Sequence, residues 1–181
     1  MKKLEEFKTV FTKYVYQFDK IKYFKNKKTN DSNCILCDIS NNIENSLLIC
    51  KSEFISVCVN LYPYNNGHIM LFPNKHIEDF LNLTDNENFH LFNLTKFFIE
   101  GLKTLYNPTG FNIGFNIGEN SGASIKHIHQ HIVPRFENEL GMIDIIGGSK
   151  VIVESPLVTH EKLKNYVIEN KSSLPFTIVF P

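Results

Sequence analysis

The stretch His127-Ile128-His129-Gln130-His131-Ile132-Val133 is the most informative segment of this 181-residue chain. Its alternating pattern predicts a β-strand over residues 127–133. Because successive side chains of a strand point to opposite faces, we expect the three imidazoles on one face, with Ile128 and Ile132 in the core. Three polar rings on one buried face need many partners, which disfavours a purely structural role.

Two kinds of chemistry fit three histidines in this pattern. In the first, two or three imidazoles bind a catalytic metal ion that activates water. In the second, one neutral imidazole attacks a phosphorus atom and forms a covalent intermediate. A neighbouring histidine would then orient the nucleophile or donate a proton to the leaving oxygen. The strand by itself leaves both alternatives open.

The loop before the strand favours phosphate chemistry. Residues 116–124 read Asn-Ile-Gly-Glu-Asn-Ser-Gly-Ala-Ser, and such small residues let the backbone approach a phosphate and offer it N–H donors. Asn116 and Ser124 add side-chain donors. Arg135, the sole arginine, follows the histidines, and arginine forks are common at anion sites.

The remaining pattern predicts an α+β domain with a mostly antiparallel sheet. A capping-box pattern over residues 84–87 begins a long helix that runs to about Tyr106, and a last helix is predicted over residues 156–169. The candidate buried positions of the long helix are Phe89, Phe92, Leu94, Phe97, Phe98, Leu102 and Leu105. Strands are predicted at residues 47–51, 54–61, 67–72, 111–117, 127–133 and 142–146.

Residues 1–33 are predicted to form an extension to the domain of residues 34–181. Apolar residues recur at three- and four-residue steps from Leu4 to Phe18, which indicates an amphipathic helix, and a polar linker follows. We expect this helix to pack onto the domain or onto a second subunit. A helix that binds a membrane surface or nucleic acid is the weaker alternative.

Composition argues against several classes of protein. With 19 basic and 19 acidic residues the formal charge is zero, which disfavours a general nucleic-acid binder. The chain is 43% hydrophobic and 21% charged, which is not a disordered composition. No apolar run approaches the about 20 residues of a transmembrane helix, and the first residues do not resemble a secretory signal. Neither nucleic acid nor a membrane is therefore expected as a partner.

The four cysteines suggest a reducing compartment. Cys34 and Cys37 form a C-x-x-C pair, which is half of a tetrahedral zinc site, and no βαβ pattern of the thioredoxin type surrounds it. Cys50 and Cys58 lie in apolar, strand-like surroundings and are predicted to be buried thiols. These four cysteines favour a cytoplasmic protein over a disulfide scaffold. For Cys34 and Cys37, reduced thiols without a metal are the alternative to a zinc site.

The sequence resembles the histidine triad (HIT) superfamily of nucleotidyl hydrolases and transferases. The signature is KHIHQHIVPR at residues 126–135, and the likeness extends upstream through residues 59–87 and downstream to residues 143–152. The segments NLYPYNNGH, GENSGAS and IIGGSK are most similar to the branch of diadenosine tetraphosphate phosphorylases and their Fhit-like relatives. The resemblance implies the HIT fold and a homodimer or higher homo-oligomer.

The resemblance also implies roles for individual residues. His129 would attack the α-phosphorus and carry a transient AMP, next to His131 and His127 of the triad. Asn60 would bind the ribose, and His68 would support the nucleotide pocket. The phosphates would be held by Asn116, Gly122, Ser124 and Lys150, although a solvated lysine is an equal reading of Lys150.

The acceptor of the AMP group decides the reaction. Attack by water would yield AMP, whereas attack by inorganic phosphate would yield ADP and ATP from diadenosine tetraphosphate. Ala123 replaces the glutamine of many Fhit-like hydrolases and favours the phosphorylase, while Phe136 replaces a tryptophan of some phosphorylases. A Hint-like phosphoramidase, which Asn60 disfavours, and a low-turnover nucleotide sensor are the alternatives. The covalent chemistry needs no cofactor, and the substrate can carry Mg²⁺.

The resemblance implies that the C-x-x-C pair belongs to a structural zinc site. Bacterial relatives with this motif complete it with a histidine after the third strand and with the first triad histidine. These positions match His76 and His127. Such a zinc has four protein ligands and no open position for water, unlike a catalytic metal. His90 and His160 are expected to be ordinary surface or packing residues.

Overall fold

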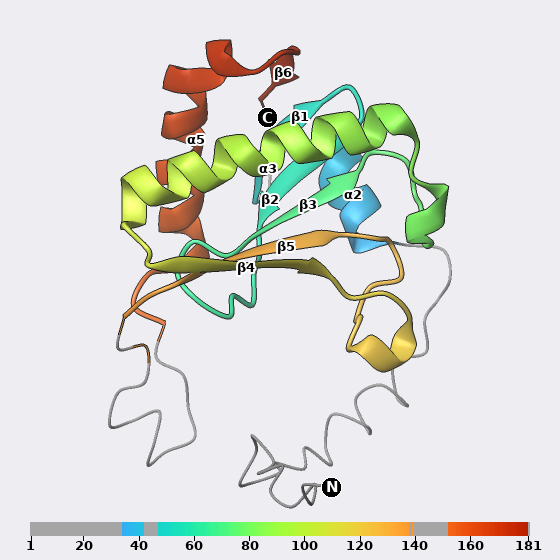
Figure 1. Ribbon diagram of the computed structural model, residues 1–181, viewed down its shortest axis with the longest axis horizontal. Helices are drawn as coiled ribbons and strands as arrows, with labels where there is room; N and C mark the ends of the chain where they lie inside the picture. The colour runs from blue at the N-terminus through green and yellow to red at the C-terminus, as the bar shows by residue number, and fades with distance from the viewer. Residues whose placement is uncertain (1–33, 42–46, 138, 140–151, 181) are drawn as a thin grey trace, which may run out of the picture. The chain divides into compact units, whose positions relative to one another are not determined.

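An antiparallel sheet organises the part of the chain that the structure describes. The structure is a computed structural model and describes residues 34–41, 47–137, 139 and 152–180. Six strands pair in the order β4-β5-β3-β2-β1-β6, and every neighbouring pair is antiparallel (Figure 1). The predicted α+β class is confirmed. The strands are β1 Leu48–Ser52, β2 Ile55–Val59, β3 Ile69–Pro73, β4 Gly110–Phe115, β5 Gln130–Arg135 and β6 Ile178–Val179.

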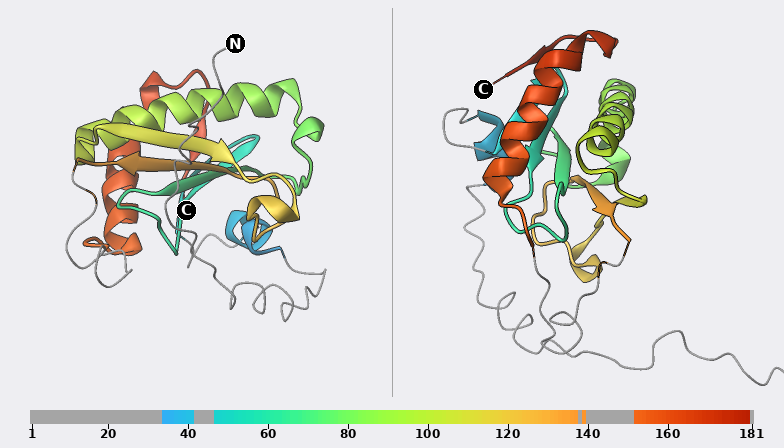
Figure 2. Two further views of the ribbon diagram at one scale, coloured as in Figure 1. Left: turned by 60° about the horizontal axis from the view of Figure 1, so that its bottom comes forward. Right: turned by 90° about the vertical axis from the view of Figure 1, so that its left-hand side faces the viewer.

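The two faces of the sheet carry different apolar clusters. Alternate residues of β2 and β3, such as Val57 and Leu71, join the main core with helix α3 (Asp85–Tyr106). The residues between them, such as Cys58 and Met70, pack instead with Leu36 of the short helix α2 (Ile35–Asn41). This alternation follows from the two-residue period of a strand. Helices α3 and α2 therefore cover opposite faces (Figure 2).

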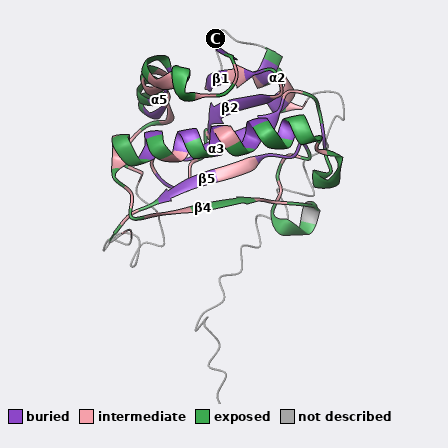
Figure 3. Ribbon diagram, turned by 45° about the horizontal axis from the view of Figure 1, so that its top comes forward, coloured by how far each residue is buried: buried purple, intermediate pink, exposed green. Residues whose placement is uncertain are grey.

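Helix α3 begins where the sequence predicts. The Thr84 hydroxyl accepts from the backbone N–H of Glu87, and the Glu87 carboxylate accepts from the N–H of Thr84. Its buried stripe includes Leu94, Phe98 and Leu102, as predicted. The buried positions predicted for Phe89 and Phe92 are wrong, since these residues are 52% and 65% exposed. Figure 3 shows buried and exposed residues alternating along α3.

The C-terminal part of the chain covers the far end of the sheet. Helix α5 (Pro156–Asn170) is capped by the Ser155 hydroxyl, ends one residue later than predicted, and contacts β1, β2 and α3. Short 3-10 turns lie at Phe80–Asn82, Glu119–Ser121 and Lys171–Ser173. Strand β6, which the sequence pattern did not predict, pairs with β1.

The histidine stretch is only partly a strand. Strand β5 begins at Gln130, so His127 and His129 lie in the loop before it and only His131 lies in the ladder. The predicted strand over 127–133 is therefore wrong at its first three residues. The reason is a contact that is distant in sequence: the Ile128 N–H donates to the carbonyl of Ile77, outside the sheet, at 2.7 Å. Ile128 and Ile132 are buried as expected.

Two predicted elements, the helix within residues 1–33 and the strand at 142–146, lie outside the described residues. In the described part, no helix combines the length and apolarity needed to span a bilayer.

Candidate active site

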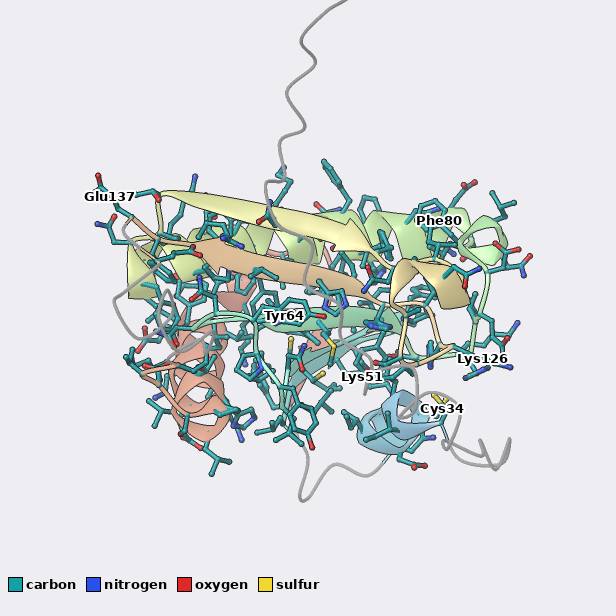
Figure 4. All side chains as sticks on the ribbon, turned by 90° about the horizontal axis from the view of Figure 1, so that it is seen from below. Cys34, Lys51, Tyr64, Phe80, Lys126 and Glu137 are labelled. Carbon is teal, nitrogen blue, oxygen red and sulfur yellow. The ribbon has the colours of Figure 1, made fainter. Side chains whose placement is uncertain are left out.

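The candidate active site lies on the face of the sheet opposite α3. His131 pairs with Met70, and Met70 belongs to the cluster on the α2 side, so the His131 ring projects to that side. The alternate residue Gln130 faces the other way, where its amide meets the Thr95 hydroxyl of α3 at 2.6 Å. Figure 4 views the site face directly, with Tyr64 over the middle of the sheet and Cys34 beside α2.

The ring of His129 is held in one tautomer. Its Nδ1 lies 2.8 Å from the backbone carbonyl of His127, and a carbonyl only accepts, so Nδ1 carries the proton. The other nitrogen, Nε2, therefore keeps a free lone pair. The side chain is 4% exposed, and its ring centroid lies 4.8 Å from that of His131. His129 thus presents a nucleophilic nitrogen next to a second imidazole.

A chain of hydrogen bonds fixes the tautomer of His131 as well. The Tyr64 N–H donates to His68 Nδ1 at 3.0 Å, so the proton of the neutral His68 ring is on Nε2. That Nε2–H donates to His131 Nδ1 at 2.9 Å. His131 therefore carries its own proton on Nε2, a buried donor without a partner among the described residues. A buried donor of this kind is costly unless a ligand oxygen accepts from it.

Burial keeps these imidazoles neutral. Burial, followed by the charge of His129, lowers the pKa of His131 to about 4. Burial, followed by the charges of His131 and His129, lowers the pKa of His68 to about 3. Burial also lowers the pKa of His129, against the opposing effect of the His127 carbonyl. At neutral pH the site therefore offers one lone pair and one N–H rather than positive charge.

Asn60 and Tyr64 complete the wall around His68. The Asn60 amide nitrogen lies 3.4 Å from each nitrogen of the His68 ring. The structure thus brings together His129, His131, His68 and Asn60, as the resemblance implied. The sequence pattern assigned no role to Tyr64. Its place in the NLYPYNNGH segment, four residues before His68, was the one available signal.

The predicted phosphate loop follows the strand that borders β5. Strand β4 pairs Gly114 with His131 and Phe115 with Gln130, and Asn116 is the first residue after β4. A side chain built on Gly114 would meet no atom within 4 Å, so open space lies beside His131. Gly118 and Gly122 have φ values of 82° and 88°, which favour glycine.

The remaining predicted residues are Gly122, Ser124, Lys150 and Arg135. Gly122 and Ser124 are exposed in the loop before His127, and Lys150 lies outside the described residues. Arg135 forms a 2.7 Å ion pair with Glu139. The Glu139 carboxylate also accepts from the Phe136 N–H and from the amide of Asn65. Arg135 therefore serves the end of β5 within the fold.

A second cluster brings the predicted metal ligands together. The ligand atoms of Cys34, Cys37, His76 and His127 all lie within 4.8 Å of one another. His127 Nδ1 is 3.5 Å from both sulfur atoms, and His76 Nδ1 is 3.4 Å from Cys37 Sγ. The donors come from α2 and the residue before it, the segment after β3, and the loop before β5. Residues about 90 positions apart in sequence therefore meet at one point.

The donor set fits a tetrahedral zinc ion. Bond lengths of about 2.3 Å to sulfur and about 2.1 Å to nitrogen separate such ligands by about 3.6 Å, close to the distances found here. The other nitrogen of His76, Nε2, lies 3.3 Å from the Glu78 carboxylate, which accepts its proton in a hydrogen bond. The Nδ1 lone pair of His76 is therefore free to face the sulfur atoms. Burial, followed by the charge of His76, lowers the pKa of His127 to about 4, so this ring is neutral. A neutral imidazole is the form that binds metal.

His127 joins the two clusters. Its ring faces the cysteines, while its backbone carbonyl holds the ring of His129. It is not positioned to act on a ligand directly. The other expectations also hold: Cys50 and Cys58 are fully buried thiols, His90 packs against Phe176, and His160 donates to the carbonyl of Leu48.

Known proteins match this chain in sequence and in fold. The AP-4-A phosphorylase of Mycobacterium tuberculosis (strain ATCC 25618 / H37Rv) is 40% identical over 110 residues, or 60% of this chain and 56% of the relative. The asymmetrical bis(5'-nucleosyl)-tetraphosphatase of Schizosaccharomyces pombe is 25% identical over 96 residues, which is 53% of each protein. The chain thus spans about half the length of these curated relatives.

The fold has a solved counterpart. A zinc-bound histidine triad family protein from Mycobacterium smegmatis superposes with a TM-score of 0.64 at 18% identity, over 78% of this chain and 97% of that one. This likeness concerns the fold. The family model for the HIT domain matches residues 41–138, more than half of the chain and the part that carries His127, His129 and His131. The chain belongs to the HIT family.

Proposed function

We propose that this protein is a nucleotidyl transferase that cleaves dinucleoside polyphosphates at the α-phosphate. The observation that carries the proposal is the arrangement of His129, whose Nδ1–H is bound to a carbonyl while Nε2 keeps its lone pair. The 40% identity to an AP-4-A phosphorylase supports diadenosine tetraphosphate as the substrate. The buried N–H of His131 supports a phosphate oxygen as its acceptor.

The proposed reaction has two displacements at phosphorus. In the first, the His129 Nε2 lone pair forms a bond to the α-phosphorus, and the bond from that phosphorus to the bridging oxygen breaks. The remaining nucleotide leaves with the electron pair on its oxygen. The positive charge that develops on the His129 ring is stabilised at Nδ1–H by the His127 carbonyl.

In the second displacement an acceptor oxygen attacks the same phosphorus, and the bond to Nε2 breaks. The lone pair returns to His129, so the enzyme is restored. The His131 Nε2–H donates to a phosphate oxygen throughout, and Asn116, the first residue after β4, would be a second donor. Asn60 would hold the ribose, and the loop of Gly122 and Ser124 and Lys150 the further phosphates.

We infer that the acceptor is inorganic phosphate, which gives ADP and ATP. The test is product analysis of diadenosine tetraphosphate turnover with and without ³²P-labelled phosphate. Phosphorolysis puts the label in the β-phosphate of ADP, and neither nucleotide forms without added phosphate. AMP and ATP in phosphate-free buffer would instead establish the alternative, hydrolysis by a Fhit-like or Hint-like enzyme.

Replacement of the nucleophile tests the covalent step. His129→Asn is expected to lower turnover by at least about 10³-fold. His160→Asn is the matched control, because His160 binds a backbone carbonyl of β1 outside the site. Full turnover by His129→Asn would disprove the covalent step. Tight nucleotide binding by the unmodified protein without turnover would favour the nucleotide sensor.

We also propose that Cys34, Cys37, His76 and His127 hold a structural zinc ion. When bound, zinc supplies a cross-link between α2 and the loop that carries the triad. The close match of the sulfur–nitrogen distances to a tetrahedral ion supports this assignment. Metal analysis of protein purified without chelator should give about one zinc per chain, and less than half would contradict it.

Finally, we propose a homodimer of a domain that spans residues 34–181, with residues 1–33 as an extension, in a reducing cytoplasm. Strand β4 has a partner on one side only among the described strands, and Ile113 on it is 42% exposed. Such an edge is suited to pairing with a second copy. Light scattering should report a mass of twice 21.0 kDa or more. A mass of one chain at micromolar concentration would exclude the dimer.

A further inference from the structure

Tyr64 presents an aromatic ring beside the catalytic histidines. Its ring centroid lies 4.8 Å from that of His68 and 5.9 Å from that of His131, with interplanar angles of 35° and 32°. The residue is nevertheless 60% exposed. In Figure 4 it lies on the open face of the sheet. The ring therefore borders the site on one side and solvent on the other.

Neither burial nor hydrogen bonding within the fold requires an aromatic side chain at Tyr64. A buried tyrosine would remove about 150–250 Å² from water, and more than half of Tyr64 stays exposed. Its hydrogen bond to His68 is made by the backbone N–H, which any residue except proline provides. Among the described residues the phenol hydroxyl has no hydrogen-bond partner. The side chain is thus free to serve a ligand.

The proposed substrate supplies a group of the right kind. A dinucleoside polyphosphate carries a base at each end, and the ribose contact at Asn60 accounts for only one nucleoside. Of the exposed aromatic rings in the described part of the chain, Tyr64 is the one in contact with His131. His131 is also the residue whose buried N–H awaits a phosphate oxygen. A flexible polyphosphate whose oxygen is bound by His131 can bend so that the base at its far end reaches the Tyr64 ring.

We propose that Tyr64 is a stacking subsite for the second nucleobase, the one that leaves with the departing phosphates. The inference rests on the proposed function and adds a specificity-determining residue to it. Stacking on an aromatic face tolerates every base, so this subsite selects for the presence of a second nucleoside rather than for its identity. It separates dinucleotides from mononucleotides that carry an equally long phosphate chain.

The test measures binding in a variant that cannot turn over. In the His129→Asn background, calorimetry gives the Kd of diadenosine tetraphosphate and of adenosine 5'-tetraphosphate, which lacks the second nucleoside. Adding Tyr64→Leu should weaken the dinucleotide about 5- to 150-fold and leave the mononucleotide within twofold. Tyr64→Phe keeps a ring and should keep the preference. Tyr62→Leu is the matched control, because Tyr62 is 81% exposed on the same loop and should change neither Kd.

Two results would overturn the subsite. Equal weakening of both ligands would mean that the ring serves the first nucleoside or the histidines, and unchanged binding of both would mean that no base reaches it. Mononucleotide binding also reports that each variant has folded. Failure of the proposed function appears separately, as absent turnover of diadenosine tetraphosphate by the unmodified protein.

Discussion

Replacement of His68 by leucine tests how the tautomer of His131 is set. His68 is fully buried, accepts from the Tyr64 N–H and donates to His131 Nδ1. Leucine fills similar space but leaves both partners unpaired. Each unpaired buried group costs roughly 1–3 kcal/mol, so the fold should lose about 2–6 kcal/mol. For a protein of this length that lowers the melting temperature by about 5–20 °C.

The effect on turnover is separate from the effect on stability. Without His68, the His131 ring is free to carry its proton on Nδ1, and Nε2 would then turn a lone pair toward the phosphate. Loss of one such donor typically lowers kcat by about 10²–10³-fold. We therefore expect His68→Leu to reduce kcat for diadenosine tetraphosphate by about 100-fold, measured at a temperature where the variant is fully folded.

The control is a second buried histidine outside the site. His90 is 7% exposed and its ring meets the Ser52 hydroxyl at 3.0 Å on the other side of the fold. His90→Leu should therefore lower stability by a comparable amount and leave kcat unchanged. If folded His68→Leu keeps a kcat within threefold of His90→Leu, the tautomer argument is wrong. His68→Gln, which retains a donor and an acceptor, should recover part of the activity.

Three further predictions follow from the same geometry. Lowering the pH from 7 to 5 should destabilise the fold, because His68 and His131 have pKa values of about 3 and 4, whereas unfolded imidazoles titrate near 6.5. The free energy of unfolding is therefore highest above about pH 6.5 and falls as the pH is lowered toward 4, by on the order of 2 kcal/mol per group at pH 5. Equal urea midpoints at both pH values would contradict this prediction. Cys37→Ser should abolish zinc retention and lower the melting temperature, while Cys50→Ala, at a buried thiol away from the cluster, should retain the metal; zinc retained by Cys37→Ser in metal analysis would disprove the site. Gly114→Val should leave the melting temperature unchanged or higher and weaken AMP binding, since its side chain would enter the open space beside His131; unchanged affinity would place the ligand elsewhere.

Local patterns in the sequence predict the elements of this fold well. The capping box at Thr84 and the serine before α5 mark helix starts that the structure confirms. The errors arise where distant contacts decide. Phe89 and Phe92 are apolar enough for a core, yet the helix turns its Leu94 and Phe98 stripe to the sheet. The two-residue strand β6 is held by its pairing with β1, which leaves little periodicity to detect.

The site shows the same division between local and distant information. Period-two alternation predicts one strand through all three histidines, but the Ile128 N–H bonds to Ile77 and ends the ladder at Gln130. Spacing alone also does not join the C-x-x-C pair to His76 and His127, which lie about 40 and 90 residues further along the chain. The likeness to a family supplied that pairing. The hydrogen bonds from Tyr64 through His68 to His131 could not be predicted from the sequence, because they begin at a backbone N–H, a group that every residue except proline has.

The double position of His127 has an evolutionary consequence. The side chain is encoded by the gene, but the carbonyl that holds His129 is common to every amino acid. Under the proposed function, a lineage that lost its cysteines, or replaced this histidine, would lose the proposed zinc site and still retain the carbonyl that holds the proposed nucleophile. The two proposed roles could therefore be lost independently, although one residue serves both.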